Sequence, residues 1–175
     1  MRGFSIMCAA VLLVGSLPAA AQTPAPVPPG SPLIDFDGFG VLTSEVRDYR
    51  MDRLVTLNDF NHRLAKKDVL LLDARSAQAF AEGHIKGAVN LPLPDFTPST
   101  LAAIIGANPD REILIYCNNN FTDNRRPVET KARPLALNIQ TFINLYGYGY
   151  KNVYELGEAV KTSDTGVNWV ISPAA

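Results

Sequence analysis

The chain has 175 residues, of which 47% are hydrophobic and 19% charged, and its formal net charge is -1. This length suits one domain with accessory segments, and a domain of this size buries a core without disulfides or metals to hold it together. The near-neutral charge, without a basic stripe, argues against nucleic acid or an anionic membrane surface as the main partner.

The first residues have the pattern of a secretory signal peptide. Arg2 is the only charge before the apolar run 6–14, and small residues follow up to Ala21. A positive start, a short apolar stretch and an A-x-A site predict cleavage after Ala21 and export to the periplasm. Because the run is well short of the ~20 residues of a spanning helix, we expect no integral membrane segment after cleavage.

Cleavage changes the cysteine count. The sequence contains two cysteines, Cys8 and Cys117, and Cys8 lies within the apolar run. The mature chain would then hold a single thiol in an oxidising compartment, where proteins generally pair their cysteines or lack them. Cys117 is therefore either a reactive thiol or a small buried hydrophobe, and the count alone does not decide between them.

Composition divides the remaining chain into an arm and a domain. Residues 22–32 are rich in Pro and Ala, which predicts an extended linker. Residues 33–45 carry apolar side chains among glycines and aspartates, and we expect an irregular arm packed on the domain. The predicted organisation is a signal peptide over 1–21, a Pro-rich linker and arm over 22–45, and one domain over 46–175.

From about residue 49, short apolar segments alternate with helical patterns. Strands are predicted at 54–55, 68–73, 87–90, 112–116 and 152–154. Helices are predicted at 56–66, 76–82 and 99–105, and from Pro134 onward. Two of the strands, 68–73 and 112–116, are continuous apolar runs typical of strands buried on both faces. This alternation predicts an α/β fold with a parallel sheet flanked by helices.

Cys117 directly follows the predicted strand 112–116. Ligands of open α/β sheets bind just beyond the carboxyl ends of strands. A thiol there meets backbone N–H groups and the positive end of a helix, both of which favour thiolate and bind anions. The two histidines, His62 and His84, are distant in sequence, so a Cys–His dyad would depend on the fold. One cysteine with two scattered histidines is a poor zinc site, and no metal is expected.

Two signatures that bracket this cysteine resemble the rhodanese-like domain family. Residues 69–75 (VLLLDAR) and 80–92 (FAEGHIKGAVNLP) are similar to its strand, D-x-R and G-H-I-x-G-A-x-N-x-P. Residues 113–117 (ILIYC) resemble the strand that delivers its cysteine, and 149–157 (GYKNVYELG) resembles its closing motif. The resemblance covers about 56–157 and implies a small α/β sheet with the cysteine at the base of an anion-binding loop.

The resemblance also implies an activity. Family enzymes are sulfurtransferases that take a sulfane sulfur from a donor such as thiosulfate, hold it as a cysteine persulfide, and pass it to cyanide or a thiol. The implied partners are a small anionic sulfur donor and a thiol acceptor, with no metal or organic cofactor. Other members resemble phosphatases or arsenate reductases with enlarged loops, and many are inactive binding modules, so these alternatives stay open.

The loop after Cys117 departs from the family pattern. Family loops are short and lead at once into a helix, whereas this chain reads CNNNFTDNRRPVETKARP and contains no glycine there. We expect the helix to begin only near Pro134, which suits a first helical position, and its dipole to lie away from the thiol. The enlarged loop 118–133 is a candidate surface for a protein partner.

The candidate site follows from these patterns. Cys117 is the predicted nucleophile and persulfide carrier. Four residues are predicted to hold the anion through backbone amides: Asn118, Asn119, Asn120 and Phe121. Asparagine is expected to replace glycine because it tolerates left-handed backbone geometry. Arg125 and Arg126 are predicted to add positive charge for the substrate.

Three polar residues of the first signature are expected to be structural rather than catalytic. Asp73 and Arg75 follow the predicted strand 68–73, where the resemblance implies that they hold loops. His84 follows Gly83 and is expected to be a turn residue that bonds to backbone.

Overall fold

The computed structural model describes residues 33–106 and 108–171. The predicted signal peptide and the Pro-rich segment 22–32 lie outside these residues. Within the described part of the chain, no helix is both long enough and apolar enough to cross a membrane.

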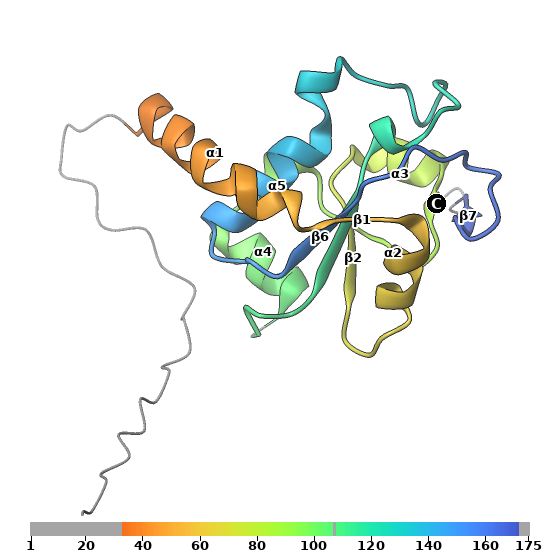
Figure 1. The fold of residues 1–175 in the computed structure, drawn as a ribbon, viewed down its shortest axis with the longest axis horizontal. Helices are drawn as coiled ribbons and strands as arrows, with labels where there is room; N and C mark the ends of the chain where they lie inside the picture. Colours follow the sequence, from red (N-terminus) through yellow and green to blue (C-terminus); the bar gives the residue numbers. More distant parts are fainter. Residues whose placement is uncertain (1–32, 107, 172–175) are drawn as a thin grey trace, which may run out of the picture.

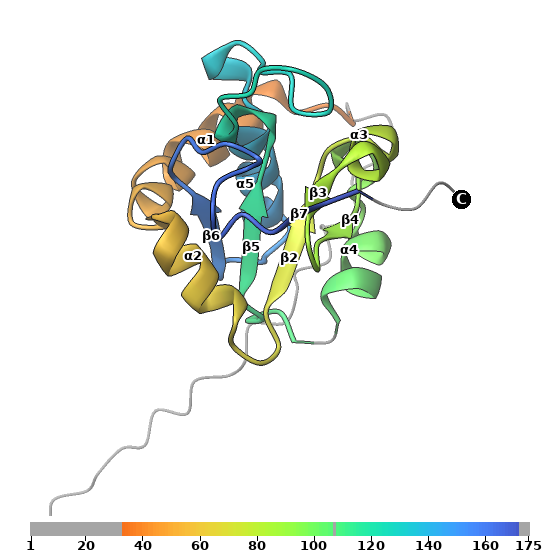
Figure 2. The same cartoon turned by 90° about the vertical axis from the view of Figure 1, so that its right-hand side faces the viewer.

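Five strands form the central sheet, and each neighbouring pair is parallel, in the order β1-β6-β5-β2-β4 (Figures 1 and 2). The strands are β1 (Leu54–Val55), β2 (Leu70–Asp73), β4 (Val89–Asn90), β5 (Ile113–Tyr116) and β6 (Val153–Leu156). In the register, Leu72 pairs with Ile115 and Ile113 pairs with Val153. The predicted α/β fold is confirmed.

Helices cover one face of the sheet, and a helix with a small second sheet covers the other. Side chains of α1 (Phe36–Met51), α4 (Pro98–Ile105) and α5 (Leu137–Gly147) share one core cluster with Leu70 and Leu72 of β2. The cluster on the opposite face contains Leu71 and side chains of α2 (Leu57–Leu64). Because successive strand residues point to opposite faces, a strand covered on both faces is apolar throughout.

Local capping explains where three helices begin. For α2 and α3 (Ala77–Glu82) the capping residue is the predicted one, whereas α4 begins at Pro98, one residue before the predicted start. Thr56 Oγ1 accepts a hydrogen bond from Asp59 N at 3.1 Å at the start of α2. Ser76 Oγ accepts from Ala79 N at 3.2 Å before α3. Thr97 caps α4. Hydroxyl groups at these positions satisfy backbone donors that the helix leaves unpaired.

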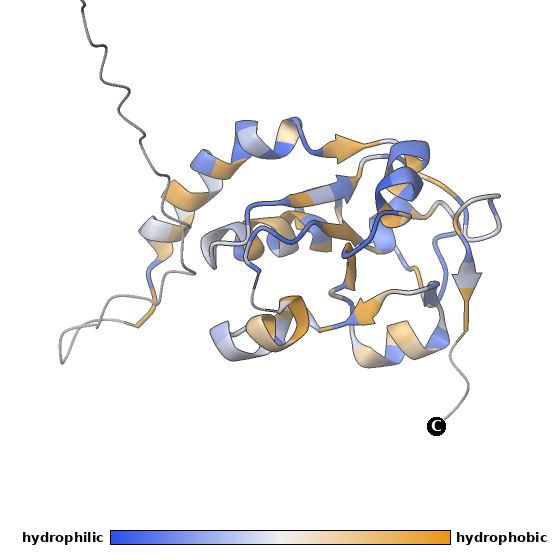
Figure 3. Ribbon diagram, turned by 90° about the horizontal axis from the view of Figure 1, so that it is seen from below, coloured by the Kyte–Doolittle hydropathy of each residue, from blue (hydrophilic) through white to orange (hydrophobic). Residues whose placement is uncertain are grey.

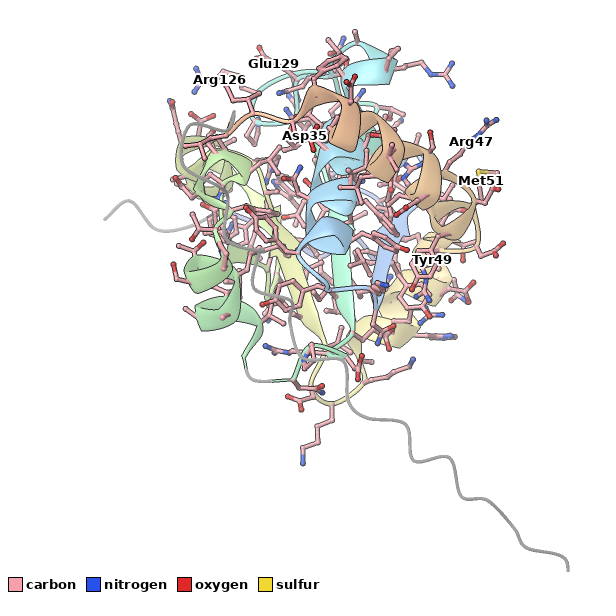
Figure 4. The ribbon with its side chains drawn as sticks, turned by 90° about the vertical axis from the view of Figure 1, so that its left-hand side faces the viewer. Asp35, Arg47, Tyr49, Met51, Arg126 and Glu129 are labelled. Atoms are coloured by element: carbon pink, nitrogen blue, oxygen red, sulfur yellow. The ribbon has the colours of Figure 1, made fainter. Side chains whose placement is uncertain are left out.

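Helix α1 corrects the expected irregular arm over 33–45. It runs from Phe36 to Met51, and the Asp35 carboxylate caps it by accepting a hydrogen bond from Gly38 N at 2.8 Å. The expected domain boundary after residue 45 therefore falls inside a helix. Glycine lowers helix propensity, which obscured the helical pattern. Tertiary packing of Tyr49 against α5 stabilises the helix, while Met51 points outward (Figure 4).

A second sheet was absent from the sequence prediction. β3 (His84–Ile85) pairs antiparallel with β7 (Trp169–Val170), which lies beyond the last predicted strand. Strands of two residues carry too little periodicity to be recognised. Three 3₁₀ turns complete the described elements: η1 (Leu93–Asp95), η2 (Asn118–Asn120) and η3 (Arg133–Leu135). Figure 3 colours these elements by hydropathy, and apolar residues occur on both strands and helices.

Candidate active site

Cys117 lies at the carboxyl end of β5, between the ends of β2 and β6. Its side chain is 1% exposed, yet it contributes to the wall of a hollow of about 410 Å³. The wall also includes charged side chains from three other parts of the chain: Arg50, Arg133, Glu155 and Glu158. A hollow of this size is in the range of small-molecule sites.

The start of α5 faces the thiol. Ala136 precedes the helix, and no side chain caps its first turn. Ala136 and Asn138 line the same hollow as Cys117, and so does Asn119 of η2. The backbone N–H groups of Asn138, Asn119 and Leu137 lower the pKa of the Cys117 thiol. The expectation that the helix dipole lies away from the thiol was therefore wrong. Pro134 belongs to η3, and α5 begins three residues later with its positive end at the cysteine.

Opposing effects act on the thiol. Burial raises the pKa of Cys117, hydrogen bonds from the N–H groups of Asn138, Asn119 and Leu137 lower it, and the negative charge of Glu155 raises it. Burial has the largest effect, so the net result is a raised pKa. Burial therefore disfavours the thiolate, while the amides at η2 and at the start of α5 favour it.

A buried polar cluster connects the thiol residue to Glu155. Cys117 N donates to Asn120 Oδ1 at 2.8 Å, and Asn138 Nδ2 donates to the same oxygen at 3.1 Å. Asn138 Nδ2 also lies 3.2 Å from Glu155 Oε1. The Arg50 guanidinium binds the Glu155 carboxylate through two hydrogen bonds of 2.7 and 2.8 Å. The Oδ1 atom of Asn138 is buried without a hydrogen-bond partner.

Asparagine side chains explain how a long loop returns to the thiol. Asn118 Nδ2 donates to Glu129 O at 2.8 Å. Asn119 exchanges two hydrogen bonds with the backbone of Lys131, at 2.8 and 3.1 Å. These bonds fasten the first part of the loop to its last part. As a result, α5 starts beside Cys117 although the two are distant in sequence.

The loop is also anchored in the core. Phe121 and Val128 are each 1% exposed, and Phe121 packs edge-on against Trp169 with ring centroids 5.0 Å apart. A left-handed backbone, which was expected at the three asparagines after the cysteine, occurs at Asn124 instead. The asparagines therefore act through side-chain hydrogen bonds rather than as substitutes for glycine.

The model of the rhodanese-like domain family matches residues 56–161. The chain belongs to this family. Among solved structures, the human single-domain sulfurtransferase TSTD1 is 20% identical, with 61% of this chain and 90% of that chain covered and a TM-score of 0.42. The rhodanese-like domain of the Anabaena sp. Alr3790 protein is 19% identical, with 61% and 96% covered and a TM-score of 0.44.

A third structure is the polysulfide-sulfur transferase homodimer of Wolinella succinogenes. It is 18% identical, with 69% of this chain and 79% of that chain covered and a TM-score of 0.39. The curated proteins gave no match.

In this rhodanese-like domain, the two predicted loop arginines are not brought to the thiol. Arg126 pairs with Glu82 of α3 beside a separate hollow of about 270 Å³, and Figure 4 shows it at the outer edge of the loop. Arg125 is exposed and contributes to neither hollow. The cationic side chains at the Cys117 hollow are Arg50 and Arg133.

Asp73 and Arg75 hold loops, as expected for structural residues. Arg75 Nη2 binds Asp73 Oδ2 at 2.6 Å and Gly83 O at 2.7 Å, and Nη1 binds Pro127 O at 3.2 Å. The Tyr116 hydroxyl donates a hydrogen bond to Asp73 Oδ2 at 2.6 Å. Burial together with the Asp73 charge raises the pKa of Tyr116.

His84 of the rhodanese-like domain does not line the Cys117 hollow. Its Nδ1 lies 2.9 Å from Phe80 O, and its ring stacks on Phe80 with centroids 3.8 Å apart. Its bond to backbone is as expected, but it belongs to strand β3 and not to a turn.

Sequence reasoning missed four residues around the thiol: Arg50, Arg133, Asn138 and Glu155. For two of them, the sequence contains a recognisable signal. Glu155 is a charged residue within the buried strand β6, and Asn138 is a polar residue at the start of an apolar helix. Buried polar groups require partners, so each predicts a second polar group nearby.

Proposed function

We propose that this chain is a sulfurtransferase that carries a sulfane sulfur on Cys117 between an anionic donor such as thiosulfate and a thiol or cyanide. The observation that carries this proposal is a strand-end thiol in a hollow that Asn119 of η2 and Asn138 at the uncapped start of α5 also line, so that backbone N–H donors lie beside it. Such donors stabilise both a thiolate and an anionic group bound beside it.

The reaction has two displacement steps. The Cys117 thiolate attacks the sulfane sulfur of thiosulfate, an S–S bond forms, and sulfite leaves with the electron pair of the cleaved bond. Cyanide or an acceptor thiolate then attacks the outer sulfur of the persulfide. The acceptor leaves with that sulfur, and the Cys117 thiolate is restored. No metal or organic cofactor takes part in this proposal.

The charges around the hollow support an anionic donor. Arg133 contributes to the same wall as Cys117 and is exposed, so its guanidinium is available to a ligand. Arginine binds oxyanions through planar paired hydrogen bonds. We propose Arg133, in place of the loop arginines, as the side chain that binds the donor. The hollow of about 410 Å³ also admits a donor or acceptor larger than thiosulfate.

We propose further that the protein acts in the periplasm. The support is the pattern of Arg2, the apolar run 6–14 and the small residues up to Ala21. The chain is expressed in a bacterial host, and the periplasmic fraction is analysed by intact mass. A product that begins at Gln22 is expected, and recovery of the uncleaved chain from the cytoplasm would contradict export.

A second candidate is a binding module that turns nothing over. It is favoured by the 1% exposure of Cys117 and by burial, which raises the pKa of its thiol. In that case the loop 118–133 recognises a protein partner or a small ligand. The pH dependence of thiol reactivity alone does not separate the two candidates. The decisive test is therefore sulfur transfer.

The test is thiosulfate-to-cyanide transfer by the full chain with Cys8→Ser, which leaves Cys117 as the only thiol. Thiocyanate production and one added sulfur on Cys117 after thiosulfate treatment, measured by mass spectrometry, are expected. Both signals should be lost in the Cys117→Ser variant. A parent protein that yields neither thiocyanate nor persulfide contradicts thiosulfate transfer and leaves the binding module.

A further inference from the structure

Helix α1 contributes a charge to the candidate site although it lies outside the family match. The match covers residues 56–161, whereas Arg50 is near the end of α1. Its Nη2 and Nε atoms bind Glu155 Oε1 and Oε2 at 2.7 and 2.8 Å. Both residues are part of the wall of the Cys117 hollow. A segment outside the family match therefore forms part of the wall of this hollow.

The Glu155 carboxylate is close enough to affect the thiol. It is 5% exposed, and its negative charge raises the pKa of Cys117. Asn138 connects the two, because its Nδ2 donates to Glu155 Oε1 at 3.2 Å and it lines the hollow together with Cys117, where its backbone N–H lowers the pKa of the thiol. A buried carboxylate beside a developing thiolate opposes ionisation of that thiolate.

The other charged groups around the hollow do not neutralise Glu155. Glu158 Oε2 accepts a hydrogen bond from Leu57 N at 2.7 Å, which directs this carboxylate to the start of α2. Arg133 of η3 is exposed and forms no ion pair among the described residues. Arg50 is thus the cation that compensates Glu155.

We propose that Arg50 is a positioning residue of the Cys117 site, which neutralises Glu155 and holds it against Asn138 so that the thiolate forms beside the start of α5. The proposal rests on the proposed function for its purpose, sulfur transfer, while its electrostatic content is independent of that reaction. It assigns α1 a role in the chemistry of the site rather than in packing alone.

The test measures the apparent pKa of the only thiol in the full Cys8→Ser chain, from the pH dependence of its alkylation by iodoacetamide. Arg50→Met leaves Glu155 uncompensated and should raise this pKa by ~1 unit, with alkylation at a fixed pH slowed by up to about tenfold. Glu155→Gln should shift the pKa downward. The double variant should fall between the two single variants, because both charges are gone.

Arg63→Met is the matched control. Arg63 pairs with Glu112 at 2.8 Å, and its side chain is 26% exposed compared with 25% for Arg50. Glu112 precedes β5 at the end opposite to Cys117, so the control removes a similar helix-to-sheet ion pair far from the thiol. It should leave the thiol pKa unchanged.

The outcomes separate the two proposals. An unchanged thiol pKa in Arg50→Met, or an equal shift in Arg63→Met, overturns the role of Arg50 even if the parent transfers sulfur. A shift in Arg50→Met without sulfur transfer by the parent sustains this role and overturns the proposed function alone. If Arg50→Met does not fold, Glu155→Gln decides, and an unchanged or raised pKa in that variant overturns the inference.

Discussion

Two buried polar clusters at the carboxyl edge of the sheet differ in how completely their hydrogen bonds are made. The Asp73 cluster consists of Asp73, Arg75 and Tyr116, and the Glu155 cluster consists of Arg50, Asn120, Asn138 and Glu155. No side-chain atom of the Asp73 cluster is buried without a partner. In the Glu155 cluster, Asn138 Oδ1 lacks one.

The two clusters also differ in what they contact. The guanidinium of Arg75 donates hydrogen bonds to Asp73 and to two backbone carbonyls, so its cluster fastens loops together. The Glu155 cluster adjoins the thiol and contributes to its hollow. A fully satisfied buried network rigidifies a fold, whereas one with a spare acceptor beside a hollow is able to bind a ligand. The comparison predicts that the first cluster governs stability and the second governs reactivity.

The largest expected effect comes from breaking the buried ion pair of the Asp73 cluster. Asp73→Asn leaves the Arg75 charge buried with weaker acceptors, and we expect a loss of ~3–5 kcal/mol in the free energy of unfolding. Urea denaturation measures this loss. The comparison fails if Asp73→Asn is nearly neutral in stability, because the cluster would then not be the structural one.

A smaller loss is expected for Tyr116→Phe. The variant removes the hydroxyl that donates to Asp73 and accepts from Ile85 N at 3.1 Å. Leaving Ile85 N unpaired in the core, while Asp73 keeps only its bonds to Arg75, should cost ~1–3 kcal/mol in urea denaturation. Thiol alkylation should keep the pH profile of the parent, and a displaced profile would show that the two clusters are coupled.

Asn138→Ala should affect the reactivity of Cys117 more than the stability of the fold. The variant removes one donor to Asn120 and Glu155 but also the unpaired Oδ1, so we expect a stability loss of ~1 kcal/mol or less. Iodoacetamide alkylation of Cys117 should slow severalfold at fixed pH, because Glu155 loses a hydrogen bond that disperses its charge. A large stability loss with unchanged alkylation would assign Asn138 to structure instead.

The smallest effect is expected at the surface pair Arg126–Glu82. Arg126→Met should leave the melting temperature and the KM for thiosulfate close to those of the parent, since exposed ion pairs contribute little and the residue lies at a different hollow. Arg133→Met is the comparison and should raise KM. A rise in KM for Arg126→Met instead would support the role that the sequence predicted for Arg126.

Much of the fold was predictable because its central strands are continuous apolar runs and its helices carry hydroxyl caps. Leu70–Asp73 and Ile113–Tyr116 are buried on both faces, which produces the strongest pattern in the sequence. Helix α1 was missed because glycines interrupt it and large apolar side chains such as Phe36 are exposed. The pattern of such a helix does not reveal which side packs on α5.

The site was only partly predictable. The position of Cys117 at a strand end follows from local sequence alone. The approach of the start of α5 to Cys117 depends on side-chain hydrogen bonds between the two halves of the loop, and spacing along the chain does not encode those bonds. The pairing of Arg50 with Glu155 joins residues from opposite ends of the domain, and only the folded chain brings them together.

The asparagine bonds across the loop have a consequence for how this chain tolerates change. Because Asn118 and Asn119 fasten the loop near its base, the geometry at the thiol is set there and not at the exposed tip around Arg125. Insertions or deletions at the tip leave the base and the start of α5 in place. The tip is thus a modular segment that evolution or engineering can exchange for a new recognition surface while the reacting atoms stay where they are.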